Sequence, residues 1–190
     1  MAVPRNRYLA FFTVAVLGFL ADLWTKSWIF DVMGPPTVAG GSPVWWLWED
    51  RLGFQTSLNE GALFGMGQGG AWVFASLSVV AAICVVVWFC RGGAAGSLWL
   101  TVALGAITAG ILGNLYDRLS LHGYRWEHIW PGRSGPIHAV RDWILVMIGD
   151  YHWPNFNIAD SLLVTGAIML VWHGLRATDV PGTSSASPSK

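Results

Sequence analysis

The chain has 190 residues, of which 54% are hydrophobic and 12% are charged, and its formal net charge at pH 7 is zero. Soluble domains carry roughly 25% charged residues, so this composition, with a mean hydropathy of +0.48, excludes an ordinary soluble domain and indicates a membrane protein. No nucleic-acid partner is expected for it.

Four hydrophobic runs are long enough to cross a bilayer, which takes about 20 helical residues. The expected spans are residues 8–30, 71–90, 96–116 and 158–175. Because four such helices form one small bundle, we expect a single domain over residues 1–176. The remaining residues, 177–190, are rich in Ser and Pro and are expected to form a disordered cytoplasmic tail.

The first run follows Arg5 and Arg7, an arrangement that is also found in cleaved signal peptides. However, the residues around Leu20 lack a small-x-small cleavage pattern and the apolar character resumes beyond them, so we expect this helix to be retained. Near its outer end, Asp22 and Lys26 stand four residues apart on one face. An acid N-terminal to a base at this spacing pairs well, so the two are expected to neutralise each other.

Beyond the first span, residues 44–48 and 52–58 are rich in strand-forming types and are separated by Glu49-Asp50-Arg51. This pattern predicts a β-hairpin, and its tryptophans are typical of the headgroup layer. The predicted fold class is therefore an all-α membrane protein with four transmembrane helices and a small extracytoplasmic β-sheet at the membrane surface.

The third span carries Ala106, Gly110 and Gly113 at helical spacing, which predicts close approach of neighbouring helices. Four side chains that hydrogen-bond or ionise are expected to converge at its outer end: Asn114, Tyr116, Asp117 and Arg118. The polar segment 120–139 follows, with two prolines and three histidines, and is expected to be irregular.

Asp142 and Asp160 flank a stretch in which Pro154 and Asn155 predict a turn that folds the two acids together. A carboxylate at the mouth of a membrane helix is costly to desolvate, so it is usually paired or functional. Two adjacent carboxyls share one proton and titrate as a unit. One acid then takes a proton from a bound water, and the other polarises a scissile carbonyl and protonates the leaving amine. Three donors are candidates for holding the tetrahedral intermediate: Asn59, Asn157 and Arg118.

Other chemistries fit the residues less well. No H-E-x-x-H or other metal-site spacing is present, so neither a metal nor a cofactor is expected. Ser134 lies in a G-x-S-G match, but in a polar loop between two prolines, and Asp150 lacks the G-x-G-D pattern of presenilin-type proteases. The alternative is an ion- or proton-coupled transporter that uses Asp22, Asp117 and Asp160, although such proteins more often show internal repeats. A non-catalytic adaptor is disfavoured because both candidate acids are present.

Five ordered motifs within residues 8–175 resemble those of signal peptidase II, the lipoprotein signal peptidase family of bacteria. They are Asp22-Leu23-Trp24-Thr25-Lys26, Asn59-Glu60-Gly61-Ala62-Leu63-Phe64, Gly110-Ile111-Leu112-Gly113-Asn114-Leu115-Tyr116-Asp117-Arg118, Val140-Arg141-Asp142-Trp143-Ile144 and Phe156-Asn157-Ile158-Ala159-Asp160-Ser161. Leu63 replaces an alanine of the family pattern and Trp143 replaces a phenylalanine. The segment 120–139 is longer than the usual connection in the family, and it either shapes substrate choice or has no part in it.

The resemblance implies a membrane aspartyl endopeptidase with Asp142 and Asp160 as its catalytic dyad. It assigns other motif residues to substrate contact or site support: Asn59, Gly61, Asn114, Asp117, Arg118, Asn157, Ala159, Asp22 and Lys26. The implied substrates are prolipoproteins whose lipobox cysteine carries diacylglycerol, cut on the N-terminal side of that cysteine. Membrane lipids are expected as partners, globomycin as an inhibitor, and a monomer as the working form.

The distribution of charge bears on orientation. With four spans, both termini lie on one side, which carries five basic residues and one acid, whereas the other side carries six basic residues and ten acids. Basic residues alone, which the positive-inside rule counts, nearly tie. We expect both termini in the cytoplasm of a bacterial inner membrane and the active site at the extracytoplasmic face.

Overall fold

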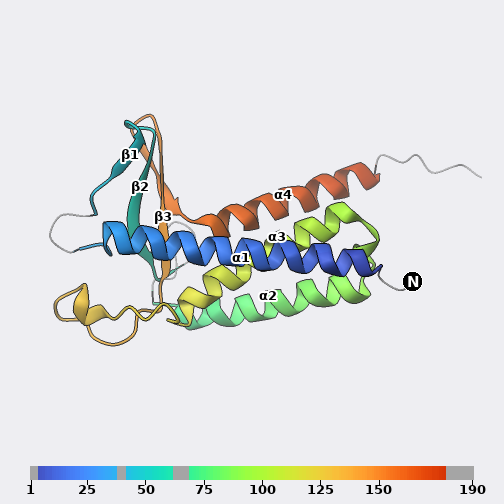
Figure 1. Ribbon diagram of the computed structural model, residues 1–190, viewed down its shortest axis with the longest axis horizontal. Helices are drawn as coiled ribbons and strands as arrows, with labels where there is room; N and C mark the ends of the chain where they lie inside the picture. The colour runs from blue at the N-terminus through green and yellow to red at the C-terminus, as the bar shows by residue number, and fades with distance from the viewer. Residues whose placement is uncertain (1–3, 38–41, 62–68, 179–190) are drawn as a thin grey trace, which may run out of the picture.

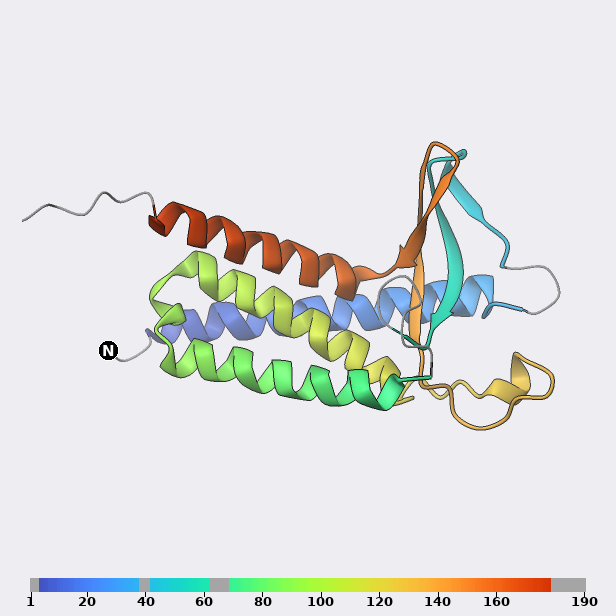
Figure 2. The same cartoon turned by 180° about the vertical axis from the view of Figure 1, so that it is seen from behind.

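A computed structural model describes residues 4–37, 42–61 and 69–178, which form a helix bundle with a β-sheet across one end (Figure 1). The helices are α1 (Arg5–Met33), α2 (Ala71–Arg91), α3 (Leu98–Arg118) and α4 (Ile158–Thr178). Each of the four is long and apolar enough to cross a membrane, as predicted. Seen from behind in Figure 2, the start of α1 and the end of α4 both lie away from the sheet.

The helices begin and end within three residues of the expected spans. A short 3-10 turn, η2 (Ala94–Gly96), joins α2 to α3, and the Ser97 hydroxyl caps α3 by accepting a hydrogen bond from the Leu100 N–H at 3.4 Å. Helix α4 continues through residues 177 and 178, which were expected to belong to the tail. The rest of that predicted tail, residues 179–190, lies outside the described residues.

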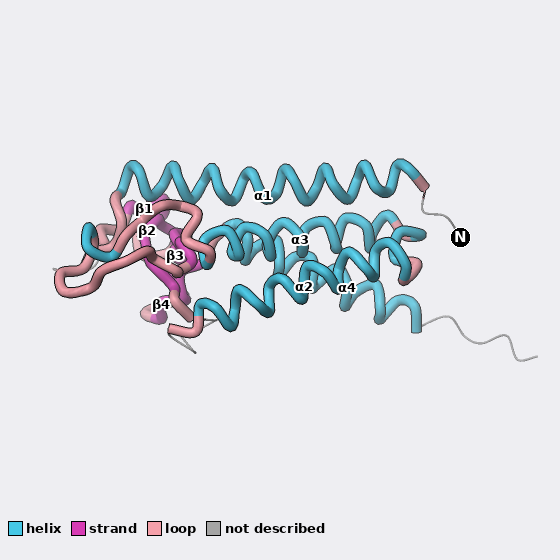
Figure 3. Tube along the Cα trace, turned by 90° about the horizontal axis from the view of Figure 1, so that it is seen from below, coloured by secondary structure: helices cyan, strands magenta, loops and turns pink. Residues whose placement is uncertain are grey.

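Helix α3 is the centre of the bundle, since it packs against α1, α2 and α4 (Figure 3). Its glycines permit this: a Cβ on Gly110 would overlap the Ala159 carbonyl group, and one on Gly113 would overlap the Asp22 carboxylate. Helices in membranes associate through such close van der Waals packing rather than through the hydrophobic effect. The predicted role of these two glycines is confirmed, and it brings α1 and α4 against the same end of α3.

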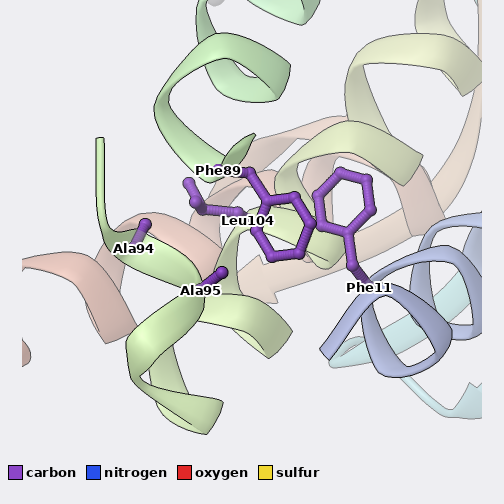
Figure 4. Close-up of a cluster of buried hydrophobic side chains, with 5 residues drawn as sticks. All are labelled: Phe11, Phe89, Ala94, Ala95 and Leu104. Atoms are coloured by element: carbon purple, nitrogen blue, oxygen red, sulfur yellow. The ribbon is translucent and has the colours of Figure 1, made fainter. Parts of the chain in front are cut away.

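An apolar cluster closes the end of the bundle away from the sheet (Figure 4). Phe11 of α1 and Phe89 of α2 stack with ring centroids 4.3 Å apart, and Leu104 of α3 belongs to the same cluster. Ala94 and Ala95 of η2 complete it. Because all five side chains are buried, the dispersion contacts among them hold α1, α2 and α3 together at this end.

The sheet has four antiparallel strands in the order β1 (Trp45–Trp48), β2 (Leu52–Asn59), β3 (Val140–Ile148) and β4 (Tyr151–Phe156). The predicted hairpin is confirmed as β1 and β2, with β2 extending one residue further than expected. The sequence analysis anticipated neither β3 nor β4. Strand β3 pairs with β2 so that Asp142 faces Ser57, and β4 leads into α4. The sheet therefore joins two distant parts of the chain beside the start of α4.

The predicted turn at Pro154 and Asn155 is wrong, because both residues belong to strand β4. The chain reverses instead at Gly149, whose φ is +62°, and Asp150. Proline, which has no backbone N–H, is tolerated in β4 because this strand is at the edge of the sheet and has no neighbouring strand on one side to accept a hydrogen bond. Since β4 runs back along β3, the reversal still returns the chain toward Asp142.

The sheet is held on the bundle by an apolar contact between α1 and β3. Ile29 and Phe30, near the outer end of α1, pack against Trp143. Phe54 of β2 meets the Trp143 ring edge-on, with 5.1 Å between ring centroids. Successive side chains of a strand point to opposite faces, so docking Trp143 on α1 turns the preceding residue, Asp142, to the other face.

Segment 120–139 is irregular, as predicted, but it has a core of its own. It contains a 3-10 turn, η3 (Trp126–His128), and an isolated bridge between Arg125 and Pro136. Its buried apolar side chains are Trp126, Ile129, Ile137 and Ala139. Leu58 of β2 packs against this cluster, so the segment is anchored at the end of β2.

Candidate active site

Asp142 and Asp160 lie at the junction of the sheet and the bundle. Asp142, on β3, is almost completely buried, and Asp160 is in the first turn of α4. The Asp142 carboxylate accepts hydrogen bonds from Nδ2 of Asn157 at 2.6 Å and from Nδ2 of Asn59 at 3.3 Å. Asp160 Oδ1 accepts one from Nδ2 of Asn114 at 2.7 Å. Asparagines from three separate parts of the chain therefore converge on the two acids.

Asn157 and Asp160 form a capping box at the start of α4. The Asp160 N–H donates to Asn157 Oδ1 at 2.9 Å, and the Asn157 N–H donates back to Asp160 Oδ2 at 3.2 Å. These reciprocal bonds satisfy backbone donors that a helix start leaves without helical partners. The spacing Asn-x-x-Asp thus fixes the direction of the Asp160 side chain by local geometry.

The amide of Asn157 connects the surroundings of the two acids. Asn157 is completely buried, and its Nδ2 donates to Asn114 Oδ1 at 3.2 Å as well as to Asp142 Oδ1. Its oxygen accepts the bond of the helix cap, so both amide hydrogens and the oxygen form bonds within the site. One residue therefore holds the relative positions of Asp142 and Asp160.

A buried ion-pair network centred on Lys26 lies behind the asparagines. Lys26 Nζ is 2.7 Å from Asp22 Oδ2 and 3.2 Å from Asp117 Oδ2, and it donates to Asn114 Oδ1 at 3.1 Å. The predicted Asp22–Lys26 pairing is confirmed, with Asp117 as a further partner. Because Lys26 occupies the Asn114 oxygen, it turns the amide nitrogen of Asn114 toward Asp160.

Asp22 also reaches helix α4 directly. Its Oδ1 accepts a hydrogen bond from the Ala159 N–H at 2.8 Å, so a carboxylate meets the positive end of the α4 dipole. The glycine at position 113 leaves the space that Asp22 occupies. The bond to Ala159 therefore fixes the start of α4, and Asp160 with it, against α1 and α3.

Arg141 belongs to this network, although the sequence analysis did not place it among the site residues. Its Nε and Nη2 donate to Asp117 Oδ1 at 3.0 and 2.9 Å, and its backbone N–H donates to Asp117 Oδ2 at 3.0 Å. Such a forked contact positions a strand far better than a single bond does. Because Arg141 directly precedes Asp142 in β3, its bonds to Asp117 fix β3 on α3 next to Asp142. Its position next to Asp142 in the motif Val140-Arg141-Asp142-Trp143-Ile144 could have indicated from the sequence that Arg141 is a site residue.

The Asn59 side chain is held by its own loop. Its Oδ1 accepts the Gly61 N–H at 3.0 Å, and Arg118 Nη2 donates to the Gly61 carbonyl oxygen at 3.4 Å. Arg118 Nε is buried without a partner in the described part of the chain. The Arg118 guanidinium interacts electrostatically with both Asp160 and Asp142. A cationic donor with unused capacity thus faces the two acids.

The surroundings of Asp142 favour its protonated form. Burial, which disfavours the charged carboxylate, raises the pKa of Asp142 well above its usual range, and the nearby Asp160 adds to this. Lys26 and the amides of Asn157 and Asn59 oppose the shift and are outweighed. The environment of Asp142 therefore favours a neutral carboxyl group over the carboxylate.

An open groove of about 570 Å³ leads to Asp142. Ser57 and Asn59 of β2 and His152 and Asn155 of β4 line it, together with neighbouring residues. These four side chains carry hydrogen-bonding groups, which suits an extended peptide better than a purely apolar ligand.

Some predicted features do not join the site. Tyr116 was expected to converge with its polar neighbours, but its hydroxyl donates to the Leu121 carbonyl oxygen at 2.9 Å and its ring contacts Phe19. Within residues 4–37, 42–61 and 69–178, His, Cys, Asp and Glu form no group of three or more that could hold a metal ion. Motif residues 62–64 lie outside the described residues.

Comparison with known proteins identifies the family. The family model described as signal peptidase (SPase) II matches residues 14–176. The chain belongs to the signal peptidase II family. The lipoprotein signal peptidase of Rhodopirellula baltica is 51% identical over 95% of this chain and 78% of its own length. That of Rhodococcus jostii is 34% identical over 95% and 80%. Family membership makes the chain a peptidase that removes signal peptides from prolipoproteins, and it does not support the transporter alternative.

Solved structures agree with this assignment. A bacterial membrane enzyme solved by the in meso method at 2.3 Å resolution superposes with a TM-score of 0.71, at 25% identity, over 94% of this chain and 93% of the other. A second, at 1.9 Å resolution, gives a TM-score of 0.67 at 27% identity over 86% and 91%. The predicted fold class is confirmed, and the chain is a multi-pass bacterial membrane protein.

Proposed function

We propose that Asp142 and Asp160 are the catalytic dyad of an aspartyl endopeptidase that cleaves diacylglyceryl prolipoproteins N-terminal to the lipidated cysteine. The observation that carries the proposal is the amide of Asn157, which bonds Asp142 directly and caps the helix turn that holds Asp160. The groove that leads to Asp142 lies beside this pair.

The two acids have different environments. Asp142 is buried with a raised pKa and is assigned the shared proton. Asp160 accepts hydrogen bonds from Asn114 and from the Asn157 backbone, and it lies in the first turn of α4, where the helix dipole favours negative charge. Asp160 is therefore assigned the role of the carboxylate base.

These assignments give a complete proton cycle. Asp160 takes a proton from a water molecule, whose oxygen attacks the scissile carbonyl while protonated Asp142 donates a hydrogen bond to the carbonyl oxygen. As the tetrahedral intermediate collapses, the C–N bond breaks and Asp142 gives its proton to the leaving amine, while the proton that Asp160 took from water stays in the dyad as the shared proton. Asn59 and Arg118 are the donors assigned to the negative oxygen of the intermediate.

The depth of the dyad fits a lipidated substrate. Helix α4 has 21 residues, which at 1.5 Å per residue is about 32 Å, close to the roughly 30 Å of the hydrocarbon core. Asp160, three residues into this helix, therefore lies near the membrane boundary. A cysteine whose acyl chains stay in the bilayer holds its peptide bond at that same depth, with the groove available for the polypeptide beyond it.

The remaining assignments follow from the same placement. Both termini are assigned to the cytoplasm and the sheet to the extracytoplasmic face, where exposed Trp45, Trp48, Tyr151 and Trp153 suit the headgroup layer. The enzyme is proposed to work as a monomer, with membrane lipids around it, without a metal or cofactor, and to be inhibited by globomycin.

Gel-shift cleavage of a diacylglyceryl precursor by the purified chain tests the dyad. Asp142→Asn and Asp160→Asn should each abolish cleavage and leave the protein inserted, whereas Asp150→Asn, at an exposed turn on the same stretch, should keep it. Wild-type activity should fall at both pH extremes and should be lost with globomycin. Near-full turnover by either dyad variant would disprove the assignment.

A further inference from the structure

Segment 120–139 is connected to the active-site loop by a specific contact. Arg133 Nη1 lies 2.7 Å from Glu60 Oε1, although the two residues are 73 positions apart. The Arg133 guanidinium also stacks over the Trp126 ring, 3.5 Å from its centroid. Trp126 belongs to the buried cluster of the segment, so Arg133 reaches Glu60 from a preorganised position.

Glu60 stands between the two residues that hold the loop at the dyad. Asn59 donates to Asp142 Oδ2 at 3.3 Å, and the Gly61 carbonyl oxygen accepts from Arg118 at 3.4 Å. The Asn59–Asp142 bond is long, so small movements of the backbone at residue 60 decide whether it forms. A contact that fixes Glu60 therefore acts on both neighbouring bonds.

This ion pair is better placed than the other one in the same segment. The Arg133 and Glu60 side chains are 43% and 19% exposed, against 50% and 36% for Arg125 and Glu127, which are only two residues apart. The Arg125–Glu127 pair closes a turn within the segment and reaches no residue of the site. It provides a matched control on the same element.

We propose that Arg133 is a positioning residue, which pairs with Glu60 so that the Asn59–Gly61 loop presents Asn59 to Asp142. The inference rests on the proposed dyad and gives the long 120–139 segment a role in turnover rather than in substrate binding. Leu58, which packs on the cluster of the segment immediately before Asn59, supports the same loop from its other side.

Charge reversal at the pair tests the inference in the full-length purified chain, with the diacylglyceryl precursor as substrate. Arg133→Glu and Glu60→Arg should each lower kcat about three- to ten-fold, since each removes one partly exposed attraction and adds a repulsion. KM should change little. The double variant should recover most of the lost kcat, and Arg133→Lys, which keeps the charge but loses the planar stack on Trp126, should lie between the wild type and Arg133→Glu.

The control variant Arg125→Glu should keep wild-type kcat. Wild-type kcat in Arg133→Glu, an equal loss in Arg125→Glu, a failure of the double variant to recover, or a change confined to KM would each overturn the inference. Failure of the dyad is distinguishable, because it appears as turnover by Asp142→Asn or Asp160→Asn. If those variants are inactive and Arg133→Glu is unaffected, only the positioning role is lost.

Discussion

Replacing Asn157 with serine separates the two tasks of this side chain. Serine and asparagine are equally good at a helix N-cap, so the bond to the Asp160 N–H is kept. Serine lacks an amide nitrogen, so the bonds to Asp142 Oδ1, at 2.6 Å, and to Asn114 Oδ1, at 3.2 Å, are lost. Asn157→Ala removes the cap as well and serves as the comparison.

The size of the effect follows from the bond to Asp142. When Asp142 gives up the shared proton, Nδ2 of Asn157 donates to a full carboxylate, and hydrogen bonds to charged groups contribute about 1.5–3 kcal/mol. At 1.36 kcal/mol per tenfold change, the loss corresponds to a decrease in kcat of about 10- to 150-fold. Asn157→Ala should show the same loss of kcat and a further decrease of about 0.5–2 kcal/mol in the free energy of unfolding.

The pH profile supplies a second readout. The Asn157 amide lowers the pKa of Asp142, so its removal raises that pKa further. If Asp142 holds the shared proton, activity at high pH is lost when Asp142 ionises, and the alkaline limb of the kcat profile should move to higher pH in Asn157→Ser.

Two measurements check this reasoning: kcat by gel-shift cleavage across pH, and thermal unfolding in detergent micelles. The expected pattern is two equally slow variants, of which the alanine variant is the less stable by the contribution of the cap. Wild-type kcat in Asn157→Ser, or an alkaline limb that moves to lower pH, would refute the bridging role. Equal destabilisation by serine and alanine would refute the separate role of the cap.

Two further predictions concern the support behind the dyad. Lys26→Met leaves the buried Asp22 carboxylate without its cation, and Asp117 keeps only Arg141. This change should destabilise the fold by about 3–5 kcal/mol, seen as a lower thermal unfolding temperature, whereas Arg5→Met at an exposed position of the same helix should not. Equal unfolding temperatures for both variants would contradict the buried network. Gly113→Ala places a methyl group against the Asp22 carboxylate, so it should lower the free energy of unfolding by about 1–3 kcal/mol through overpacking and should reduce cleavage. Gly96→Ala, whose Cβ meets nothing within 4 Å, should change neither stability nor cleavage. A stable and active Gly113→Ala enzyme would show that α1 and α3 can move apart at this point.

The helices and the first hairpin were predictable because their signals are local. A run of apolar residues specifies a span wherever it occurs in the chain, and the observed helices begin and end within three residues of those runs. Strands β1 and β2 are separated by three residues, so their pairing needs no distant partner. The motifs that resemble signal peptidase II are also sequence features, and they named both acids before any geometry was known.

Strands β3 and β4 were missed for the opposite reason. Residues 140–148 form strand β3 because they pair with β2, which is far away in the sequence; Asp142, for example, lies opposite Ser57. Turn propensity is a local signal, and it predicted a turn at Pro154 and Asn155. In the structure both residues belong to the edge strand β4, where a proline is tolerated. Pairing between distant segments thus overrode the local preference.

Four membrane-spanning helices and two candidate acids could be predicted from the sequence alone, because hydropathy, spacing and motif order are properties of contiguous residues. The sequence also contained the Asn157-x-x-Asp160 cap, which is local. Three contacts are apparent only in the folded protein: the Asn157 amide bonds Asp142, Arg141 rather than Tyr116 joins the polar network, and Arg133 pairs with Glu60. Those contacts join segments far apart in the chain, and their geometry is set by how the sheet and helices pack.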